Sequence, residues 1–297
     1  MTLEQLRIFV AVAEREHMTQ AAGALNMTQS AASASIAALE ARHRIKLFDR
    51  MGRRIALTSA GKSFLVEAKA VLAQAFVAEQ ALADLAGLKT GALTLAASQT
   101  IGNYWLPPRL SRFAALYPGI AIRLTICNTE EVAALALAGE VDLGFVEGEV
   151  DEPALAIRPI DEDELILVAA PGRFPSLTGS DVEWLTQSPW VAREKGSGTR
   201  TAFEAALHHF GVATSARNIV LELPSNEAVR AAVEAGSGLA AMSRLVVNAS
   251  INAGSLVALP LALPRRQFFL LRHKERYESL AARAFVESAE RFASSPR

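Results

Sequence analysis

Residues 18–61 read MTQAAGALNMTQSAASASIAALEARHRIKLFDRMGRRIALTSAG, and this stretch decides how the N-terminal part of the chain folds. Within it, residues 27–40 have the composition of a helix built mostly from Ala and Ser. Ile36 and Leu39 are the large branched apolar side chains of that helix. Most globular helices bury a wider apolar stripe. This helix therefore has a narrow apolar stripe, and the side chains on its opposite face are short.

A helical wheel of about 100° per residue sharpens this picture. One arc holds Ala32, Ile36, Leu39 and His43, which we expect to face the core. The opposite arc holds Ser30, Ala34, Ala37, Ala38 and Ala41. A DNA major groove about 12 Å wide admits a helix, and short side chains favour close approach.

The sequence before this helix predicts two more helices. Residues 3–15 carry apolar side chains at helical spacing, which indicates an amphipathic helix. Thr19 is a candidate cap for a short second helix, Asn26 a candidate for its left-handed end, and Thr28 a candidate cap for the third helix. Two helices joined by so short a turn are typical of a helix-turn-helix.

Two short apolar runs follow the third helix, at 45–48 and 55–57, and flank a turn that contains Gly52. This pattern predicts a β-hairpin with a basic tip, that is, a wing. Residues 1–62 hold nine basic and five acidic residues, a balance of +4 in a chain whose net charge is −1. A basic end on an otherwise acidic chain favours a polyanionic partner for that end; the alternative is a solvated charged face.

These features nominate a DNA-binding surface. Recognition helices meet base edges with their N-terminal residues, and basic wing residues can hold phosphates or enter the minor groove. A small helical bundle that docks a protein is the alternative. The candidate DNA contacts are Thr28, Gln29, Ser30, Ala31, Ser33, Arg50, Arg53 and Arg54.

Thr58 or Ser59 can cap a long helix that runs without proline to residue 88. Apolar residues recur along it at alternating steps of four and three, as in a coiled-coil seam. We expect this linker helix to pair with a second copy of the chain; packing on the protein's own core is the alternative. The seam consists of Phe64, Ala68, Val71, Ala75, Ala78, Leu82 and Leu85.

Beyond a hinge at 88–92, strand patterns alternate with helix patterns. Strands are predicted at 92–98, 120–126, 141–146, 155–160, 164–170, 190–194, 218–223, 238–243 and 266–273. Helices are predicted at 106–117, 130–138, 199–210, 226–235, 244–253 and 276–293. This alternation predicts a mainly parallel α/β architecture in two lobes.

Taken together, LRIFVAVAE (6–14), the stretch quoted above and the α/β remainder resemble the LysR-type transcriptional regulators over the whole chain. The resemblance implies a winged helix-turn-helix at 1–58, a linker and dimerisation helix at 59–88, and an effector-binding domain at 92–297 similar to periplasmic binding proteins. Lobe I would comprise 92–161 and 267–293, and lobe II 162–266. Ser30 and Ala34 depart from the family pattern, in which proline and arginine are common, so affinity should depend more on the wing.

The resemblance also implies partners. It implies double-stranded promoter DNA, a homodimer through the linker helix, a homotetramer, and contact with RNA polymerase, with transcription changed when an effector shifts the lobes. SQTIGNYWLPPRL, NTEEV, FVEG and REKGSGTR are similar to the CysL-type, sulfur-related branch, which suggests sulfite, sulfate or a related oxyanion.

In this fold a small molecule binds between the lobes, at the C-terminal ends of strands. Helix N-termini in SQTIGN and GSGTR offer hydroxyl and N–H groups to an anion, with plain helix capping as the alternative. Glu147 could instead select a protonated or polar group. The alternative effector is a metabolite that is uncharged, or one that is aromatic or carries a carboxylate. The candidate residues are Ser98, Thr100, Asn128, Thr129, Glu147, Ser197, Gly198, Thr199, Arg200 and Ser225.

Other functional classes fit less well. No G-x-S-x-G elbow is present around GSGTR, and His208 and His209 are adjacent in a helix, where neighbours diverge. We therefore expect no enzyme, no metal and no cofactor. The sole cysteine, Cys127, lies in a strand pattern. A transport binding protein would not explain the basic N-terminus, and without a signal peptide or membrane span we expect a cytoplasmic protein.

Overall fold

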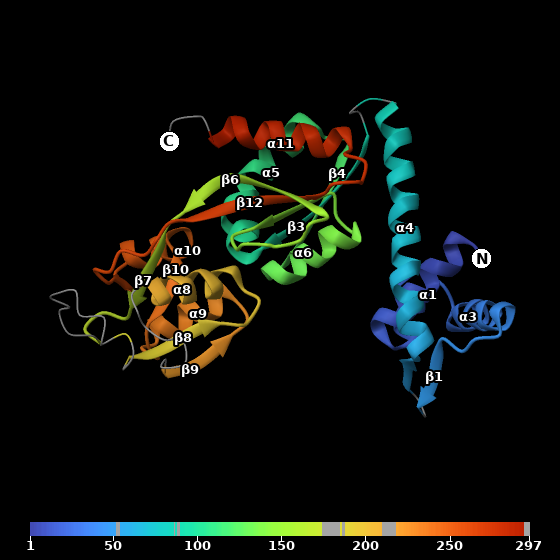
Figure 1. The fold of residues 1–297 in the computed structure, drawn as a ribbon, viewed down its shortest axis with the longest axis horizontal. Helices are drawn as coiled ribbons and strands as arrows, with labels where there is room; N and C mark the ends of the chain where they lie inside the picture. The colour runs from blue at the N-terminus through green and yellow to red at the C-terminus, as the bar shows by residue number, and fades with distance from the viewer. Residues whose placement is uncertain are drawn as a thin grey trace. The chain divides into compact units, whose positions relative to one another are not determined.

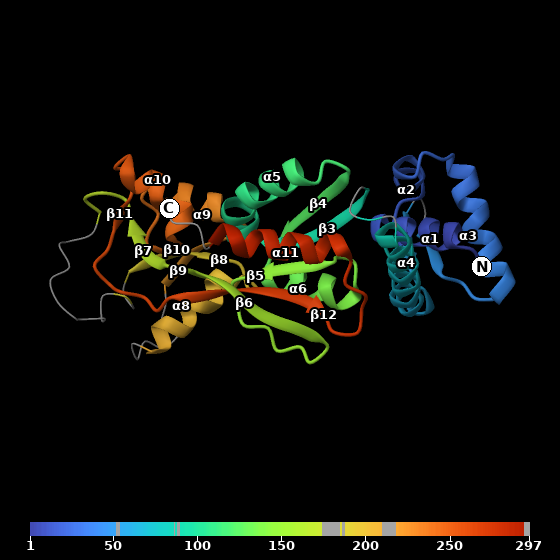
Figure 2. The same ribbon diagram turned by 90° about the horizontal axis from the view of Figure 1, so that it is seen from above.

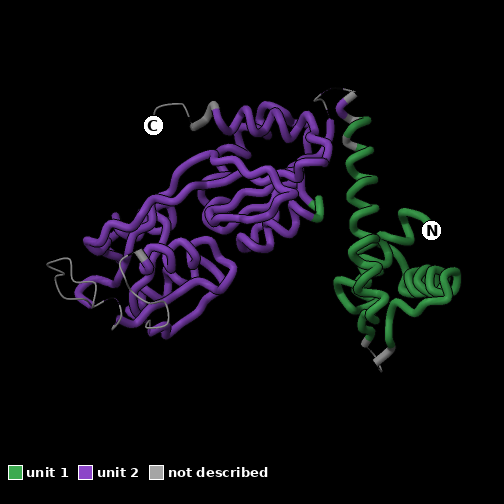
Figure 3. Tube along the Cα trace, viewed as in Figure 1, with its two compact units in different colours: residues 1–82, 138–140 green, residues 83–137, 141–297 purple. Residues whose placement is uncertain are grey.

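The fold is that of a computed structural model, which describes residues 1–51, 54–85, 87, 90–173, 185, 188–209 and 218–293 (Figure 1). The chain divides into two compact units (Figure 3). Unit 1 contains residues 1–82 and 138–140, and unit 2 contains 83–137 and 141–297. No helix in the described ranges combines the length and apolarity needed to cross a bilayer.

Unit 1 holds three helices, a β-hairpin and a long helix, as the sequence predicts. The elements are α1 (Leu3–Arg15), α2 (Met18–Ala24), α3 (Gln29–His43), β1 (Phe48–Met51), β2 (Arg54–Leu57) and α4 (Ser59–Leu85). Strands β1 and β2 pair antiparallel, with Phe48 opposite Leu57.

The helix ends follow local capping chemistry. Thr28 caps α3, and Asn26 adopts the left-handed conformation with φ 53°, as expected. The predicted cap of α2 is wrong: His17 is the cap residue, its ring Nδ1 accepting from the Gln20 N–H, and Thr19 lies inside the helix. Of the two candidates for α4, Thr58 is the cap, because its hydroxyl accepts from Gly61 N–H at 2.9 Å.

The core of unit 1 is mainly aliphatic, with a cluster of phenylalanines inside it. The ring of Phe9 packs 5.5 Å from Phe48 and 4.8 Å from Phe64, which joins α1, the hairpin and α4. On α3, Ala32, Ile36 and Leu39 are buried as predicted, but His43 is exposed and Glu40 is buried instead. The start of α4 therefore packs on the unit's own core, whereas Val71 and Leu82 further along are exposed.

Lobe I of unit 2 is built on a five-stranded sheet of order β4-β3-β5-β12-β6. The strands are β3 (Gly91–Ser98), β4 (Ile120–Cys127), β5 (Leu143–Val146), β6 (Leu155–Asp163) and β12 (Arg266–His273). Helices α5 (Leu106–Leu116) and α11 (Leu280–Ala293) lie together on one face, and α6 (Thr129–Ala138) on the other (Figures 1 and 2). Successive side chains of a strand point to opposite faces of the sheet. Leu95 and Ala97 of β3 accordingly pack with α5 and α11, whereas Ala96 packs with α6.

Lobe II has its own apolar clusters and two smaller sheets, β10-β7-β11 and β8-β9. Its strands are β7 (Leu165–Ala169), β8 (Pro189–Arg193), β9 (Asn218–Leu223), β10 (Ala240–Ser243) and β11 (Val257–Ala258). Its helices are α8 (Gly198–His209), α9 (Asn226–Glu234) and α10 (Arg244–Asn252). The predicted domain and lobe boundaries stay predictions. They require the chain to cross between the lobes near residues 159–163 and near residues 264–267, and β6 ends and β12 begins within these two crossovers.

Three details differ from the expected pattern. The five-stranded sheet is mixed rather than mainly parallel, because the returning strand β12 pairs antiparallel with β5 and β6, and the β10-β7-β11 sheet is antiparallel. The last helix begins at Leu280, not at residue 276: the Leu280 N–H and the Tyr277 hydroxyl both bond Asp84. A short π-helix, η1 (Ile101–Trp105), follows β3, and the prolines of the next segment fall in the first turn of α5, where they are tolerated.

Candidate functional site: a helix-wing surface and an interlobe cleft

The N-terminal end of α3 is open to a partner. Gln29, Ser30 and Ala31 are exposed, and Ser33 is half-buried. The Thr28 hydroxyl accepts from the Ala31 N–H at 3.2 Å and lies 3.1 Å from the Ser30 hydroxyl. Small, exposed and polar side chains thus occupy the turn that sequence reasoning assigned to base contacts, while the contacts themselves stay a prediction.

The C-terminal end of α3 is tied to the hairpin by a carboxylate that the sequence did not reveal. Glu40 accepts from the Lys46 ammonium at 2.8 Å, from Leu47 N–H at 2.8 Å and from Phe48 N–H at 3.2 Å. Burial of the carboxyl opposes ionisation, but these hydrogen bonds and the Lys46 charge lower the pKa of Glu40 overall. The helix and the first wing strand therefore share one buried acceptor.

The wing carries the predicted arginines in these positions. Arg50 lies in β1 opposite Ile55, and Arg54 lies in β2 opposite Met51. Arg53 lies outside the described residues. The backbone thus places Arg50 and Arg54 near the end of the hairpin, where a wing can reach a DNA backbone.

In unit 2, the threonines proposed from the two lobes come together on an arginine. Thr100 follows β3 of lobe I, Thr199 lies in the first turn of α8 of lobe II, and both are buried. Arg266 donates from Nη1 to the Thr199 hydroxyl at 3.0 Å and from Nη2 to the Thr100 hydroxyl at 3.5 Å. One guanidinium thus bridges both lobes.

Arg266 is anchored by the other interlobe crossover. Its Nε lies 2.7 Å and its Nη2 2.6 Å from the Asp163 carboxylate, whose second oxygen accepts from the Ser243 hydroxyl at 2.7 Å. Asp163 ends β6 and Arg266 begins β12, and the two residues are register partners. Both residues are buried, so this ion pair holds the two crossovers side by side.

Further hydrogen bonds link the lobes around Thr100. Asn226 donates from Nδ2 to the Thr100 hydroxyl at 3.1 Å and accepts from Arg193 at 2.7 Å. Gln99 donates to the Pro224 carbonyl at 2.7 Å and accepts from the Asn226 N–H at 2.9 Å. The start of α9 is therefore fastened to the end of β3.

Glu147 is the buried acid of the cleft. Its Oε1 accepts from the Thr199 hydroxyl at 3.5 Å and lies 3.9 Å from Nη1 of Arg266. Burial raises the pKa of Glu147 above its ordinary value; Arg266 and the nearby Thr100 side chain act against this. Burial thus favours the neutral form of this carboxyl more than exposure to solvent would.

Three buried polar atoms at the strand ends of lobe I find no hydrogen-bond partner within the described part of the chain: Ser98 Oγ, Thr129 Oγ1 and Glu147 Oε2. Buried polar groups are normally satisfied, so these atoms are free to bond solvent or a ligand. The lobes also touch closely here, since a Cβ on Gly148 would lie 3.2 Å from the Gly198 Cα. Unused hydrogen-bonding capacity therefore gathers on the lobe I side of the cleft.

The remaining candidates have structural partners of their own. Asn128 and Ser225 accept from the N–H groups of Glu131 and Ala228, each at 3.0 Å, as helix caps do. Arg200 bonds Glu204, Glu222 and the Arg193 carbonyl, all within lobe II. Ser197 is buried in the turn before α8. A binding role for any of these stays a prediction.

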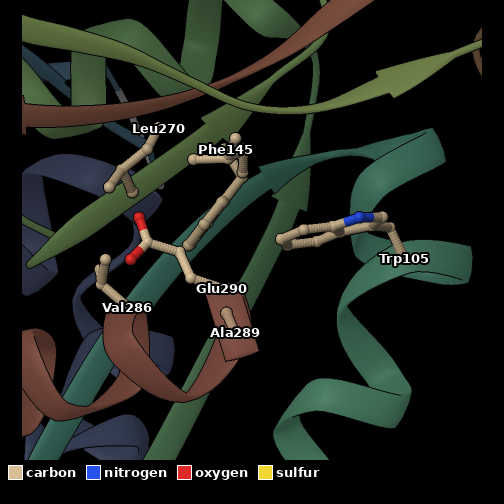
Figure 4. A pocket seen from close by; sticks show the side chains of 7 residues that line it. Trp105, Phe145, Leu270, Val286, Ala289 and Glu290 are labelled. Carbon is tan, nitrogen blue, oxygen red and sulfur yellow. The ribbon is translucent and has the colours of Figure 1, made fainter. Parts of the chain in front are cut away.

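A cavity within lobe I offers little room. It lies between Trp105 and Phe145 on one side and α11 on the other, with the Glu290 carboxylate beside Leu270 and Val286 (Figure 4). Its volume is about 10 Å³, the room of a single water at most. We attribute it to core packing, in contrast to the polar cleft.

Sequence reasoning placed Asn226 at the cleft together with Ser225 but gave it no binding role, and it assigned no role to Arg266 or Asp163, although signals for them existed. Asp163 and Arg266 are among the charged residues at the two expected crossovers, and Asn226 directly follows Ser225. Charged residues at chain crossovers of a two-lobed fold merit attention, because both crossovers border the cleft.

Two family profiles match the chain. "Bacterial regulatory helix-turn-helix protein, lysR family" matches residues 3–62, and "LysR substrate binding domain" matches residues 86–293. The second match alone covers more than half of the chain and includes the whole interlobe cleft.

Individual proteins agree with these profiles. The "Uncharacterized HTH-type transcriptional regulator YeiE" of Escherichia coli K12 is 35% identical over 290 residues, which is 97% of this chain and 96% of that protein. The "HTH-type transcriptional regulator CysL" of Bacillus subtilis is 34% identical over 252 residues, 83% of this chain and 82% of that one. Full-length CbnR, solved in complex with its target DNA, matches with a TM-score of 0.71 and 24% identity over 98% of this chain and 99% of that chain.

Proposed function

The chain belongs to the LysR family of bacterial transcriptional regulators, and from this premise we propose that a small anion held between lobe I and lobe II controls its binding to promoter DNA. The family consists of DNA-binding regulators, not enzymes. What remains to be assigned is the signal. The observation that carries the proposal is the meeting of Thr100 and Thr199, from different lobes, on the buried Arg266.

The chemistry of the cleft favours an oxyanion. Arg266 supplies permanent positive charge, and the N-terminus of α8 adds backbone N–H groups and the positive end of a helix dipole. The unpartnered hydroxyls of Ser98 and Thr129 can each donate one hydrogen bond. An anion with several oxygens, such as sulfate or sulfite, or a small carboxylate, can use all of these donors together.

The binding test is a thermal-shift screen of the full chain with sulfate, sulfite, phosphate and small carboxylates. A ligand that binds the folded protein raises its midpoint of unfolding. We expect one oxyanion to do so in the wild type and not in Thr100→Val, which replaces a buried hydroxyl of the cleft. Thr125→Val, at an exposed position of β4, is the control. A screen without any shift would favour an uncharged metabolite.

We propose that Gln29, Ser30 and Ser33 read bases, with Thr28 and Ala31 beside them, and that Arg50, Arg53 and Arg54 hold phosphates. A fluorescence titration with the DNA upstream of the protein's own gene tests this. Phosphate-led binding weakens steeply with salt, because neutralised phosphates release counterions. Affinity that does not change with salt concentration would contradict the proposal.

We further propose that the chain dimerises through α4 and assembles into tetramers that hold two winged pairs on bent DNA, in the cytoplasm and within reach of RNA polymerase. The exposed apolar residues Val71 and Leu82 on α4 support this pairing. Light scattering after chromatography tests it with the double variant Val71→Glu, Leu82→Glu. We expect smaller particles for this variant than for the wild type, and an unchanged mass would count against pairing through α4.

A further inference from the structure

We propose that Glu147 is a built-in competitor of the effector: its carboxylate occupies the anion position of the clamp formed by Thr100, Thr199 and Arg266, and an incoming anion must displace it. This inference rests on the proposed function, since it concerns the regulation of the same cleft. In the ligand-free protein, the position for the anion is then filled by the protein's own carboxylate.

The hydrogen-bond directions carry the first step. Thr100 accepts from Asn226 at 3.1 Å and from Arg266 at 3.5 Å, and Thr199 accepts from Arg266 at 3.0 Å. A hydroxyl has a single hydrogen to donate. In Thr199 that hydrogen is directed to Glu147 Oε1, 3.5 Å away, and Arg266 Nη1 lies 3.9 Å from the same oxygen. The Thr199 hydroxyl and the Arg266 charge that an external anion needs are therefore already engaged by a carboxylate of the chain.

The position of the carboxylate carries the second step. Glu147 directly follows the buried strand β5 and is 3% exposed, so its carboxylate lies in the interior beside the clamp. Its Cγ lies 3.0 Å from the point where a Cβ on Gly198 would be, hence against the N-terminus of α8. A competitor fixed this close acts at a high effective concentration and lowers the apparent affinity of the cleft for a free anion.

The charges around Glu147 carry the third step. Arg266 of β12 and Arg193 of β8 favour the carboxylate, whereas burial and Asp163 of β6 disfavour it, and the balance raises the pKa of Glu147. A raised pKa means that the carboxyl takes up a proton at higher pH than an exposed glutamate does. Protonation removes the competing charge, so the cleft should bind an anion more tightly as pH falls.

The experiment measures sulfate binding to the full chain by isothermal titration calorimetry in the wild type and in Glu147→Gln. Sulfate is the probe because its own charge stays constant near neutral pH. We expect Glu147→Gln to bind sulfate roughly tenfold more tightly, as when a competent state populated at about 10% becomes dominant. Glu149→Gln, an exposed neighbour in lobe I, removes the same charge nearby and should match the wild type.

A pH series on the wild type is the second measurement and does not depend on the folding of a variant. Affinity for sulfate should rise as pH falls toward the pKa of Glu147, which lies above the ordinary glutamate value of 4.5, and should stay constant in Glu147→Gln over the same pH series. Weaker or equal binding by Glu147→Gln, or a wild-type affinity that is flat with pH, would overturn the inference while leaving the anion site intact. Absence of binding by both proteins would overturn the anion site itself, and the competitor with it.

Discussion

A single methyl group at Gly198 should test whether the two lobes touch as described. A Cβ added there would lie 2.8 Å from Thr129 Oγ1, 3.0 Å from the Glu147 Cγ and 3.0 Å from the Gly148 N, all in lobe I. The backbone at Gly198 has no positive φ, so the effect of Gly198→Ala is steric and not conformational. The Thr129 side chain can turn away, but the backbone nitrogen of Gly148 cannot.

The magnitude follows from these distances. Overpacking a closed interface costs about 1–3 kcal/mol in the free energy of unfolding. For a unit of roughly 200 residues, each kcal/mol lowers the unfolding midpoint by about 2–4 °C. The lobes should also separate slightly, and the first hydrogen bond to break should be the longer one, between Arg266 and Thr100 at 3.5 Å. Sulfate affinity should change along with stability.

The assay is thermal unfolding of the full chain, with and without sulfate. Gly23→Ala is the matched control, because nothing lies within 4 Å of a Cβ added at that helical position. We expect the control to be neutral or slightly stabilising, as alanine is in helices. An unchanged midpoint and sulfate affinity in Gly198→Ala would refute the close approach of the two lobes.

Two further predictions concern other parts of the chain. Glu40→Ala leaves two buried donors, Leu47 N–H and Phe48 N–H, without a partner, and each should lower the free energy of unfolding by about 1–3 kcal/mol. Lys46→Met should lower it less, because the Lys46 ammonium is exposed. Urea unfolding measures the free energy of unfolding of both variants. Because the pKa of Glu40 is lowered in the folded state, its contribution to stability is present above the ordinary value of 4.5 and is lost as pH falls through the folded pKa. The difference in stability between Glu40→Ala and the wild type should therefore shrink in acid. Equal stability of the two proteins at neutral pH would refute the role of Glu40. Burial, and to a lesser degree the charge of Glu131, raises the pKa of Cys127 to about 11, so about 0.1% of the side chain is thiolate at pH 8. Alkylation of Cys127 by iodoacetamide should therefore be far slower than alkylation of a free thiol, and fast labelling would contradict this.

Periodicity in the sequence carried most of the element assignments. Helices such as α3 and strands such as β3 appear within a few residues of their expected bounds, because their apolar spacing reflects the face that they bury. The cap of α2 was missed because a histidine ring nitrogen replaced the usual hydroxyl. For α4, local pattern could not decide between the two adjacent hydroxyls.

The failures of the prediction involve partners far apart in the sequence. Glu40 is polar, and its burial depends on backbone N–H groups seven and eight residues further on. Arg266 depends on Asp163, Thr100 and Thr199, which are 67 to 166 residues away. Such contacts form only after the strands find their order, and no periodicity in the chain encodes them.

The buried acceptor at Glu40 has a geometric consequence for the operator. Glu40 fixes the end of α3 to β1, so the recognition helix and the wing should keep a constant distance from each other. B-form DNA turns once in about 10–10.5 base pairs. One base pair inserted between the DNA positions that α3 and the wing contact therefore rotates one position relative to the other by about 35°. A helix and wing held at a fixed distance cannot follow that rotation. Operators of this regulator should therefore tolerate changes of base between the two positions far better than changes of length.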